Sequence, residues 1–249
     1  MSHAVAVEAI TFDFFNTLVS HRDGMGGRGK QVMEYLQSHG IESEPWEHQV
    51  LYDVFEPHAR EYSPAFSAEE KDRYHVRVAE RLFRRLKVGM AAQRAAHHAT
   101  EMWQLIGPRS LEVFPDVRPT LERLREEGYR LAVVSNWQCG LGHFCVELGL
   151  GGLFRAVIVS AEVGAEKPDR RMFEEACRHL KTEPRQVLHV GDSPDEDVEG
   201  AQAAGLNALL ICRDHDAAPA GSTCIRTLEE LPGRVKPANR PAGRTHSAT

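Results

Sequence analysis

Short apolar runs alternate with amphipathic stretches along much of the chain, which is the pattern of an α/β fold. The apolar runs are rich in β-branched residues, as strands buried on both faces of a sheet should be, and they lie at 5–12, 129–135, 154–160, 186–192 and 207–212. Helical periods follow between them, and Gly128 and Gly205 mark the ends of the first and last of these helices. The pattern therefore predicts a three-layer α/β core with a parallel, doubly wound sheet.

The stretch from about 21 to 110 has a different pattern, because amphipathic helical periods replace the alternation of strands and helices. Ser67 and Glu70 have the spacing of a capping box at the start of one of these helices, and Gly89 follows its end. Residues near the C-terminus have no apolar period and include proline, glycine and polar side chains. We predict three parts in the chain, namely a core at 1–20 and 111–235, a helical insertion at 21–110 and a disordered tail at 236–249.

Composition argues against several classes of protein. The chain has 249 residues and a net charge of -6, so nothing in its charge favours nucleic acid as a partner. The start of the sequence lacks a signal-peptide pattern, and no apolar run reaches the roughly 18 residues of a membrane span. Its cysteines form no CxxC pair and are odd in number, which argues against a disulfide framework or a zinc cluster. We expect a cytoplasmic protein without a nucleic-acid or membrane partner, while a monomer and a homodimer both remain open.

Polar side chains follow four of the predicted strands. Asp13 follows the first strand, Ser135 and Asn136 end the second, and Lys167 and the acidic segment 192–197 follow later ones. Ligands of an open parallel sheet bind beyond the carboxyl ends of its strands, so these residues are candidates for one site. A carboxylate nucleophile, a hydroxyl, a cation and an acidic cluster together suit attack on an electrophile that carries negative charge.

Four motifs in this order resemble those of the haloacid dehalogenase (HAD) superfamily of hydrolases. They are FDFFNTL at 12–18, VVSNW at 133–137, EKPD at 166–169 and VGDSPDEDVEGAQAAG at 190–205. The last is the most specific, since its glycines, alanines and acidic residues match together. The resemblance covers roughly residues 5–232. It implies a Rossmann-like core, a helical cap inserted after the first motif, and hydrolysis through a covalent aspartyl intermediate.

The resemblance also implies a role for each matching residue. Asp13 would be the nucleophile, and Thr17 would order the loop after it within the substrate-binding region. Ser135 and the backbone amide of Asn136 would hydrogen-bond the transferring group. Lys167 would neutralise charge on the nucleophile and on that group.

Mg²⁺ is the cofactor that the resemblance implies. Its ligands would be Asp13, the backbone carbonyl of Phe15 and Asp192, while Asp197 would hold a metal-bound water or Lys167. Clustered carboxylates repel one another unless a cation is present, and Mg²⁺ prefers carboxylate oxygens together with water and phosphate. The implied substrate is a small anionic metabolite, with phosphate esters as the favoured class.

The first motif departs from the phosphatases of the superfamily at Phe15. Those enzymes have a second Asp at this position, which acts as general acid and base, whereas a phenyl ring cannot transfer a proton. Three functions stay open. We favour a magnesium-dependent phosphatase; the alternatives are a metal-independent 2-haloacid dehalogenase, a group that also has an aromatic residue here, and a binding or regulatory module without activity.

Two further groups of residues lie outside the motifs. The glycine-rich segment 21–30 contains Arg28, which either binds an anionic substrate or belongs to a hinge between core and cap. Lys30 in the same segment is a weaker candidate for a Schiff-base lysine. His97 and His98 have no ligand-like spacing, so we predict surface or core positions for the histidines.

Overall fold

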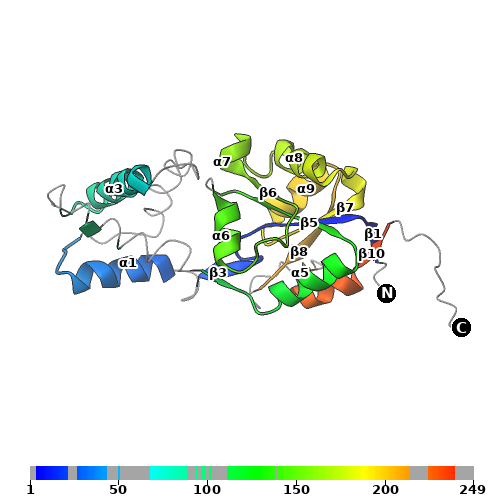
Figure 1. Ribbon diagram of the computed structural model, residues 1–249, viewed down its shortest axis with the longest axis horizontal. Coiled ribbons are helices and arrows are strands. Elements are labelled where there is room, and N and C mark those ends of the chain that lie inside the picture. The colour runs from blue at the N-terminus through cyan, green and yellow to red at the C-terminus, as the bar shows by residue number, and fades with distance from the viewer. Residues whose placement is uncertain are drawn as a thin grey trace, which may run out of the picture.

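A six-stranded parallel sheet lies at the centre of the computed structural model (Figure 1). The structure describes residues 4–21, 27–43, 50, 68–88, 94, 97–98, 101, 111–137, 140–213 and 224–238. The strand order is β6-β5-β2-β7-β8-β9, with the bounds β2 Ala9–Phe12, β5 Arg130–Ser135, β6 Ala156–Val159, β7 Val187–Gly191, β8 Asn207–Ile211 and β9 Cys224–Ile225. All five pairings are parallel, so the parallel, doubly wound sheet predicted from the apolar runs is confirmed.

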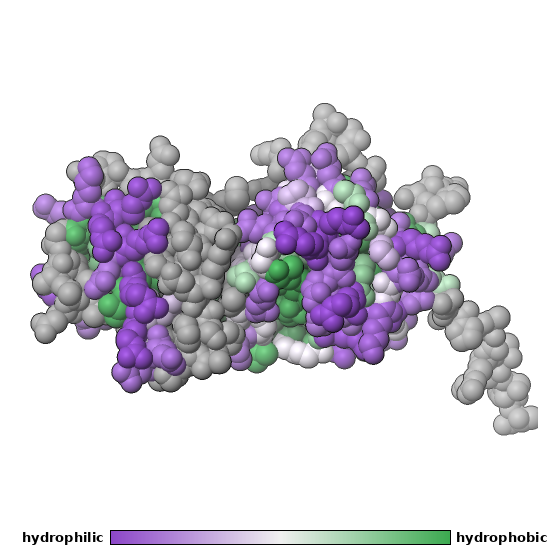
Figure 2. Space-filling view, turned by 90° about the horizontal axis from the view of Figure 1, so that it is seen from above, coloured by the Kyte–Doolittle hydropathy of each residue, from purple (hydrophilic) through white to green (hydrophobic). Residues whose placement is uncertain are grey.

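Alternate residues of each strand face opposite layers of helices. In β5, Leu131 and Val133 belong to one hydrophobic cluster, and Ala132 and Val134 belong to a second one. The helices that share these clusters are α5 (Val117–Glu126), α6 (Leu141–Glu147) and η4 (Leu228–Gly233) for the first, and α8 (Arg170–Leu180) and α9 (Gly200–Ala203) for the second. The surface over α8 is largely hydrophilic when seen from above (Figure 2). The sheet is therefore covered on both faces, as in the predicted three-layer core.

The single strand predicted at 5–12 is wrong, because the chain is interrupted at Glu8. The Glu8 carboxylate accepts hydrogen bonds from Arg130 (Nη2 to Oε2, 2.5 Å) and from Gln186 (Nε2 to Oε1, 3.1 Å). A polar side chain held in this way stops the apolar run, and only the second half of it, β2, enters the central sheet.

The first half of that run, β1 (Val5–Val7), pairs in parallel with β10 (Val235–Pro237). This short strand corrects the start of the predicted disordered tail, since Lys236 and Pro237 are paired with β1. The rest of that prediction, from 239 to 249, lies outside the described residues.

β2 lies between β5 and β7, which lead into opposite halves of the sheet. Phe12, the last residue of β2, is in register with Val133 of β5 and Val190 of β7. Because the three strands are parallel and in register, the segments that follow them start at the same edge of the sheet. The strand order reverses at this point, which is where an open α/β sheet binds its ligands.

Helices α1 (Gly27–Ser38) and α3 (Ala68–Arg85) form a helical part to one side of the core (Figure 1). They have a hydrophobic cluster of their own, which includes Val32, Leu36, Tyr74, Val78 and Leu82. An antiparallel ribbon of β3 (Val19–His21) and β4 (Leu111–Val113), which we did not predict, lies at the borders of the inserted segment. This arrangement is compatible with a helical cap inserted after the first motif. No helix in the described ranges is long and apolar enough to cross a membrane.

The predicted helix ends are confirmed at two glycines. Gly128 (φ 95°) and Gly205 (φ 85°) follow α5 and α9 in the left-handed conformation that glycine adopts without strain. The last predicted helix differs in its first turns, because Pro194–Glu199 (η3) is a π-helix that precedes α9. Ser67 and Gly89, the predicted cap and end of α3, lie outside the described residues.

A buried ion pair between Arg213 and Asp116 supports the loop after β2. The Arg213 Nη1 lies 2.8 Å from Oδ1 and 2.7 Å from Oδ2 of Asp116, and its Nη2 donates to the carbonyl of Thr17 (2.6 Å). The N–H of Leu228 also donates to Asp116 (2.6 Å). Since Thr17 belongs to the loop that begins at Asp13, the pair links that loop to β8 and α5.

We predict that Arg213→Met destabilises the protein by about 3 kcal/mol, because the buried Asp116 carboxylate loses its cation. Urea unfolding followed by circular dichroism measures the change. Arg123→Met is the matched control, since Arg123 pairs with Glu127 on an exposed helix face. Its free energy of unfolding should change by no more than about 0.5 kcal/mol. Equal effects of the two substitutions would contradict the proposed support of the loop.

Candidate active site

Asp13 begins the loop that follows β2, and hydrogen bonds fix the backbone around it. Its N–H donates to the carbonyl of Val190 in β7 (2.9 Å), and the N–H of Leu18 donates to the carbonyl of Phe14 (2.9 Å). Asn16 has a φ of 57°, a left-handed conformation that Asn tolerates better than most residues. The loop therefore turns immediately after the carboxylate and remains anchored to the central strands.

Lys167 connects two buried carboxylates. Its Nζ donates to Oδ1 of Asp13 (2.6 Å) and to Oδ1 of Asp197 (2.5 Å), and the hydroxyl of Ser135 donates to the same Asp13 oxygen (3.0 Å). The side chains of Lys167, Asp13 and Asp197 are only 2%, 8% and 1% exposed. Hydrogen bonds of this kind between charged, buried groups are short and strongly orienting. The structure thus brings together four of the residues predicted for one site.

Burial and neighbouring charges shift the pKa values of Asp13, Lys167 and Asp197. Burial is the largest influence on Asp13 and raises its pKa, although Lys167 lowers it in part. Burial disfavours the charged form of Lys167, but Asp13 and Asp197 together raise the pKa of Lys167 above its usual range. Burial also disfavours ionised Asp197, yet Lys167 and His189 hold its pKa well below the usual range. The ammonium therefore stays charged, with Asp197 as its permanent partner.

Asn136 joins the end of β5 to the segment that carries Lys167. Its side-chain oxygen accepts from the N–H of Lys167 (2.7 Å), and its Nδ2 donates to the Lys167 carbonyl (3.1 Å). The same Nδ2 donates to Oε2 of Glu196 (3.0 Å). Because one amide holds both backbone groups of Lys167, Asn136 positions the lysine, whereas the resemblance implied only a contact of its backbone amide with substrate.

The sequence did not predict a role for His189 or Thr11, which support Asp197 from the side of the sheet. His189 of β7 lies with Nε2 at 2.9 Å from Oδ1 of Asp197 and with Nδ1 at 2.9 Å from the hydroxyl of Thr11 in β2. Both polar side chains are buried within otherwise apolar strands. A polar residue in a strand buried on both faces needs a hydrogen-bond partner. The presence of His189 within an apolar run was therefore the feature of the sequence that could have indicated this contact.

Gly191 leaves the space that Asp197 occupies. A Cβ at Gly191 would lie 2.1 Å from Cγ of Asp197, so any larger residue would displace the carboxylate. The N–H of Ser193 donates to Oδ2 of Asp197 (3.0 Å), while Lys167 and His189 contact Oδ1. Both oxygens of Asp197 therefore have partners, which suits it to hold Lys167 rather than to bind a metal directly.

The carboxylates of the site fit a divalent cation. Asp13, Asp192 and Asp197 each place one oxygen within 4.8 Å of the others. Burial, then the charges of Asp13 and Asp197, raise the pKa of Asp192 to about 7. A cation next to Asp192 would relieve that repulsion, and carboxylate oxygens are the ligands that Mg²⁺ prefers. Asp13 and Asp192 are thus the residues that would hold Mg²⁺, and a contact with the Phe15 carbonyl stays a prediction.

A pocket of about 270 Å³ opens in front of these groups. Its polar lining comes from Asp13, Asn16, Ser135, Asn136, Lys167, Asp192, Ser193, Glu196 and Asp197, and its aromatic lining comes from Phe15 and Trp137. The rings of Phe15 and Trp137 lie 6.3 Å apart between centroids, and Phe14 packs edge-on against Trp137 at 5.4 Å. The pocket therefore combines charged side chains with an aromatic part, which suits an anionic group attached to a less polar body.

Thr17 and Arg28 are the two predicted site residues that are not among the described residues lining this pocket. Thr17 is fully buried within the loop and is not among the residues that line the pocket, so its role in substrate binding stays a prediction. Arg28 lies within α1, but its side chain is outside the part of the chain that the structure describes. Its role in binding an anion stays a prediction.

We predict that Asp192→Asn raises the thermal stability of the metal-free protein at pH 8. The folded pKa of the group is raised from 3.8 to about 7, so its ionisation destabilises the fold fully above pH 7, and this destabilisation is lost gradually as the pH falls from about 7 towards 3.8. A relief of about 1 kcal/mol would raise the unfolding midpoint by about 2–4 °C. Differential scanning calorimetry in EDTA tests this, with the exposed Asp195→Asn as control. An unchanged or lower midpoint for Asp192→Asn would rule out this repulsion.

Comparisons with known proteins agree with this geometry. A family model described as haloacid dehalogenase-like hydrolase matches residues 7–205. The glyceraldehyde 3-phosphate phosphatase of Methanopyrus kandleri is 30% identical over 213 residues, which cover 83% of this chain and 84% of that protein. The haloacid dehalogenase-like hydrolase domain-containing protein 3 of Bos taurus is 28% identical over 242 residues, 93% of this chain and 92% of that one.

Solved structures share the fold. The 2-haloacid dehalogenase from Pseudomonas syringae pv. Tomato DC3000 superposes with a TM-score of 0.66 over 92% of this chain and 97% of its own, at 24% identity. This likeness concerns the fold alone. Because the family model spans most of the sequence, and its motifs meet in one pocket, the chain belongs to the haloacid dehalogenase-like hydrolases.

Proposed function

We propose that this hydrolase is a magnesium-dependent phosphatase of small phosphate esters, with Asp13 as nucleophile. The observation that carries the proposal is the position of Asp13, whose carboxylate contacts Lys167 and Ser135 at the pocket and has Asp192 beside it. The name of the 30% identical M. kandleri relative, a phosphatase of a three-carbon phosphate ester, supports the same class of substrate.

The first step would transfer the phosphoryl group to Asp13. A carboxylate oxygen of Asp13 forms a bond to phosphorus, and the bond between phosphorus and the ester oxygen breaks with its electron pair staying on that oxygen. Lys167 and Ser135 already donate hydrogen bonds at the attacking carboxylate, so they can also stabilise the charge on the phosphoryl oxygens. Mg²⁺ held by Asp13 and Asp192 would neutralise further charge on that group.

The second step would hydrolyse the aspartyl phosphate. Water attacks phosphorus, the bond between phosphorus and the Asp13 oxygen breaks, and inorganic phosphate leaves with the carboxylate restored. Phe15 lines the pocket two residues after Asp13, at the position where the phosphatases of the superfamily carry their general acid and base. The leaving oxygen must therefore take its proton from solvent or leave without one, so substrates with acidic leaving groups should react fastest.

Two other functions that the sequence left open differ from this proposal, the dehalogenase in needing no metal and the binding module in lacking turnover. A 2-haloacid dehalogenase is favoured by the aromatic side chain of Phe15, but the acidic cluster of Asp13, Asp192 and Asp197 supports a metal-dependent enzyme. A binding module without activity would retain the pocket and lack turnover. The cytoplasmic location and the oligomeric state stay predictions.

We predict magnesium-dependent release of phosphate from a panel of small phosphate esters, acyl phosphates included. Asp13→Asn should lower kcat/KM by at least about 10⁴-fold, because the nucleophile is lost. A malachite-green assay of the purified protein measures both rates. Asp195→Asn, an exposed change in the same acidic segment, is the control that should keep its activity. Halide release from 2-haloacids without metal would instead support the dehalogenase, and no turnover with either panel would support the module.

We also predict that Phe15→Asp raises the rate most for substrates with poorly acidic leaving alcohols. A positioned acid is worth about 10²–10⁴ in rate, and aryl phosphates need it less than alkyl phosphates do. The test is a plot of log kcat/KM against leaving-group pKa for wild type, Phe15→Asp and Phe15→Asn. The asparagine variant is the control, because its side chain is about as large as that of aspartate and cannot act as an acid. A flatter slope for Phe15→Asp alone is expected. Parallel slopes for the three proteins would show that the missing acid does not limit the reaction.

A further inference from the structure

A second cluster of potential metal ligands lies in the helical part, away from the active-site pocket. His39 follows α1 directly, and His98 and Glu101 come from a helical segment about sixty positions further along the chain. One ring nitrogen of each histidine and one oxygen of Glu101 lie within 4.8 Å of one another. We propose that His39, His98 and Glu101 bind a divalent transition-metal ion of the Zn²⁺ class.

The donor set suits this class of ion. Two imidazoles and one carboxylate are ligands that Zn²⁺ accepts, with a fourth position left for water or another ligand. His98 is buried, whereas the side chains of His39 and Glu101 are 39% and 43% exposed. One ligand is therefore anchored in the helical part and two face solvent, so an ion has a path of entry and an open position.

The tautomer of His39 favours metal binding. Its Nδ1 lies 2.9 Å from the backbone carbonyl of Tyr35, and because a carbonyl can only accept, this nitrogen must carry the proton. In neutral His39 the lone pair is then on Nε2, which lies 3.9 Å from Oε2 of Glu101. These two acceptors can share one cation, either a proton or a metal ion. Tetrahedral Zn²⁺ would place such ligand atoms about 3.4 Å apart, so a small contraction is enough.

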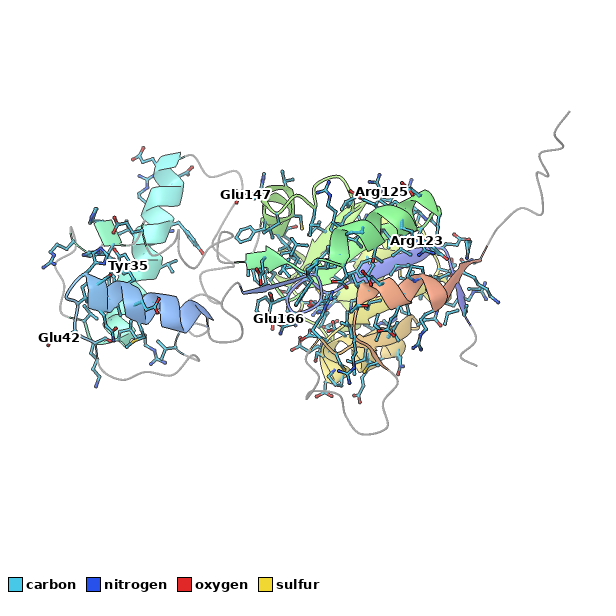
Figure 3. The ribbon with its side chains drawn as sticks, turned by 90° about the horizontal axis from the view of Figure 1, so that it is seen from below. Tyr35, Glu42, Arg123, Arg125, Glu147 and Glu166 are labelled. Atoms are coloured by element: carbon cyan, nitrogen blue, oxygen red, sulfur yellow. The ribbon has the colours of Figure 1, made fainter. Side chains whose placement is uncertain are left out.

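Tyr35 holds all three ligands in position. Its hydroxyl donates to Oε2 of Glu101 (2.5 Å) and lies 2.6 Å from Nδ1 of His98. Its ring stacks on His39 with 4.1 Å between centroids. Tyr35 extends from α1 within the helical part (Figure 3). Partners that orient the first ligands in this way are typical of metal sites and raise their affinity.

The hydrogen bonds of Tyr35 also assign the lone pair of His98. The Tyr35 hydroxyl has one proton and donates it to Glu101, so Nδ1 of His98 donates to that hydroxyl and neutral His98 carries its lone pair on Nε2. An ion at this site would join the segment of His98 and Glu101 to the end of α1. Since the unfolded chain does not bring these residues together, binding should stabilise the folded helical part.

The test is zinc binding to the untagged full-length protein in millimolar Mg²⁺, which competes for the carboxylates of the active site. We expect one Zn²⁺ per chain, measured by competition with a chromophoric chelator and by metal analysis after dialysis. His39→Gln and Glu101→Gln should each weaken the affinity by at least about tenfold; Glu101→Gln still accepts from Tyr35 and is therefore the variant least disturbed in fold. His179→Gln is the matched control, because His179 also lies beside a glutamate (3.1 Å) on an exposed helix.

Two further readouts separate this site from other causes. Asp192→Asn should leave the zinc stoichiometry unchanged, since it alters only the active site. Co²⁺ in place of Zn²⁺ should give the visible absorption of a tetrahedral site in wild type and in His179→Gln, and lose it in His39→Gln. Equal zinc affinity of wild type, His39→Gln and Glu101→Gln would overturn the proposal. So would loss of the bound zinc in Asp192→Asn, or fewer than one ion per chain in wild type.

Discussion

The buried ammonium of Lys167 is the interaction on which the active site depends. Asp13 and Asp197 approach the same nitrogen at 2.6 and 2.5 Å, and neither carboxylate could stay ionised at such burial without it. The lysine leaves the pair of carboxylates with one net negative charge, and Asp192 adds a second when it ionises. This surplus of negative charge would favour a divalent cation, and the proposed anionic substrate would need that cation beside it.

The core provides this interaction by bringing distant segments to one edge of the sheet. Asp13 follows β2 and Ser135 ends β5, so parallel register places their backbones close together, and Asp197 lies in the helical turn η3 that follows β7, the other neighbour of β2. Lys167 is the exception, because it follows a short helix, α7 (Ser160–Val163), after an outer strand. The side chain of Asn136 positions Lys167 instead, since it hydrogen-bonds both backbone groups of Lys167 and connects them to the end of β5.

Much of this site could be predicted from sequence, because its residues follow strands whose apolar runs are plain and whose order limits the topology. Asp13, Ser135, Lys167 and Asp192 were found in this way. The pair of Thr11 and His189 was missed because strand residues are interpreted by hydrophobicity, and a buried hydrogen bond between two strands has no local pattern. The β3–β4 ribbon was missed for a related reason, since three residues on each side are too few to show a period.

The histidine cluster illustrates a stronger limit. His39 and His98 are far apart in sequence, and the spacing rules for metal sites describe ligands within one turn or one helix. Only the packing of α1 against the later helical segment brings them together through Tyr35, whose aromatic ring belongs to the hydrophobic cluster of the helical part. The prediction of ordinary core or surface positions described each residue correctly, since His98 is buried and His39 and His97 are exposed, but it could not describe the group.

At Phe15 the loop keeps the backbone that presents Asp13 but lacks a side chain that can transfer a proton. The loop still presents Asp13 to Lys167, because its backbone is fixed by Val190, by Arg213 through Thr17, and by the left-handed turn at Asn16. None of these contacts depends on the side chain at position 15. That side chain instead packs against the hydrophobic core beside Trp137 and forms the apolar side of the pocket. In the proposed phosphatase, a ring in place of a carboxylate would therefore leave charge binding intact and would change what surrounds the leaving group, from a proton donor to an aromatic surface.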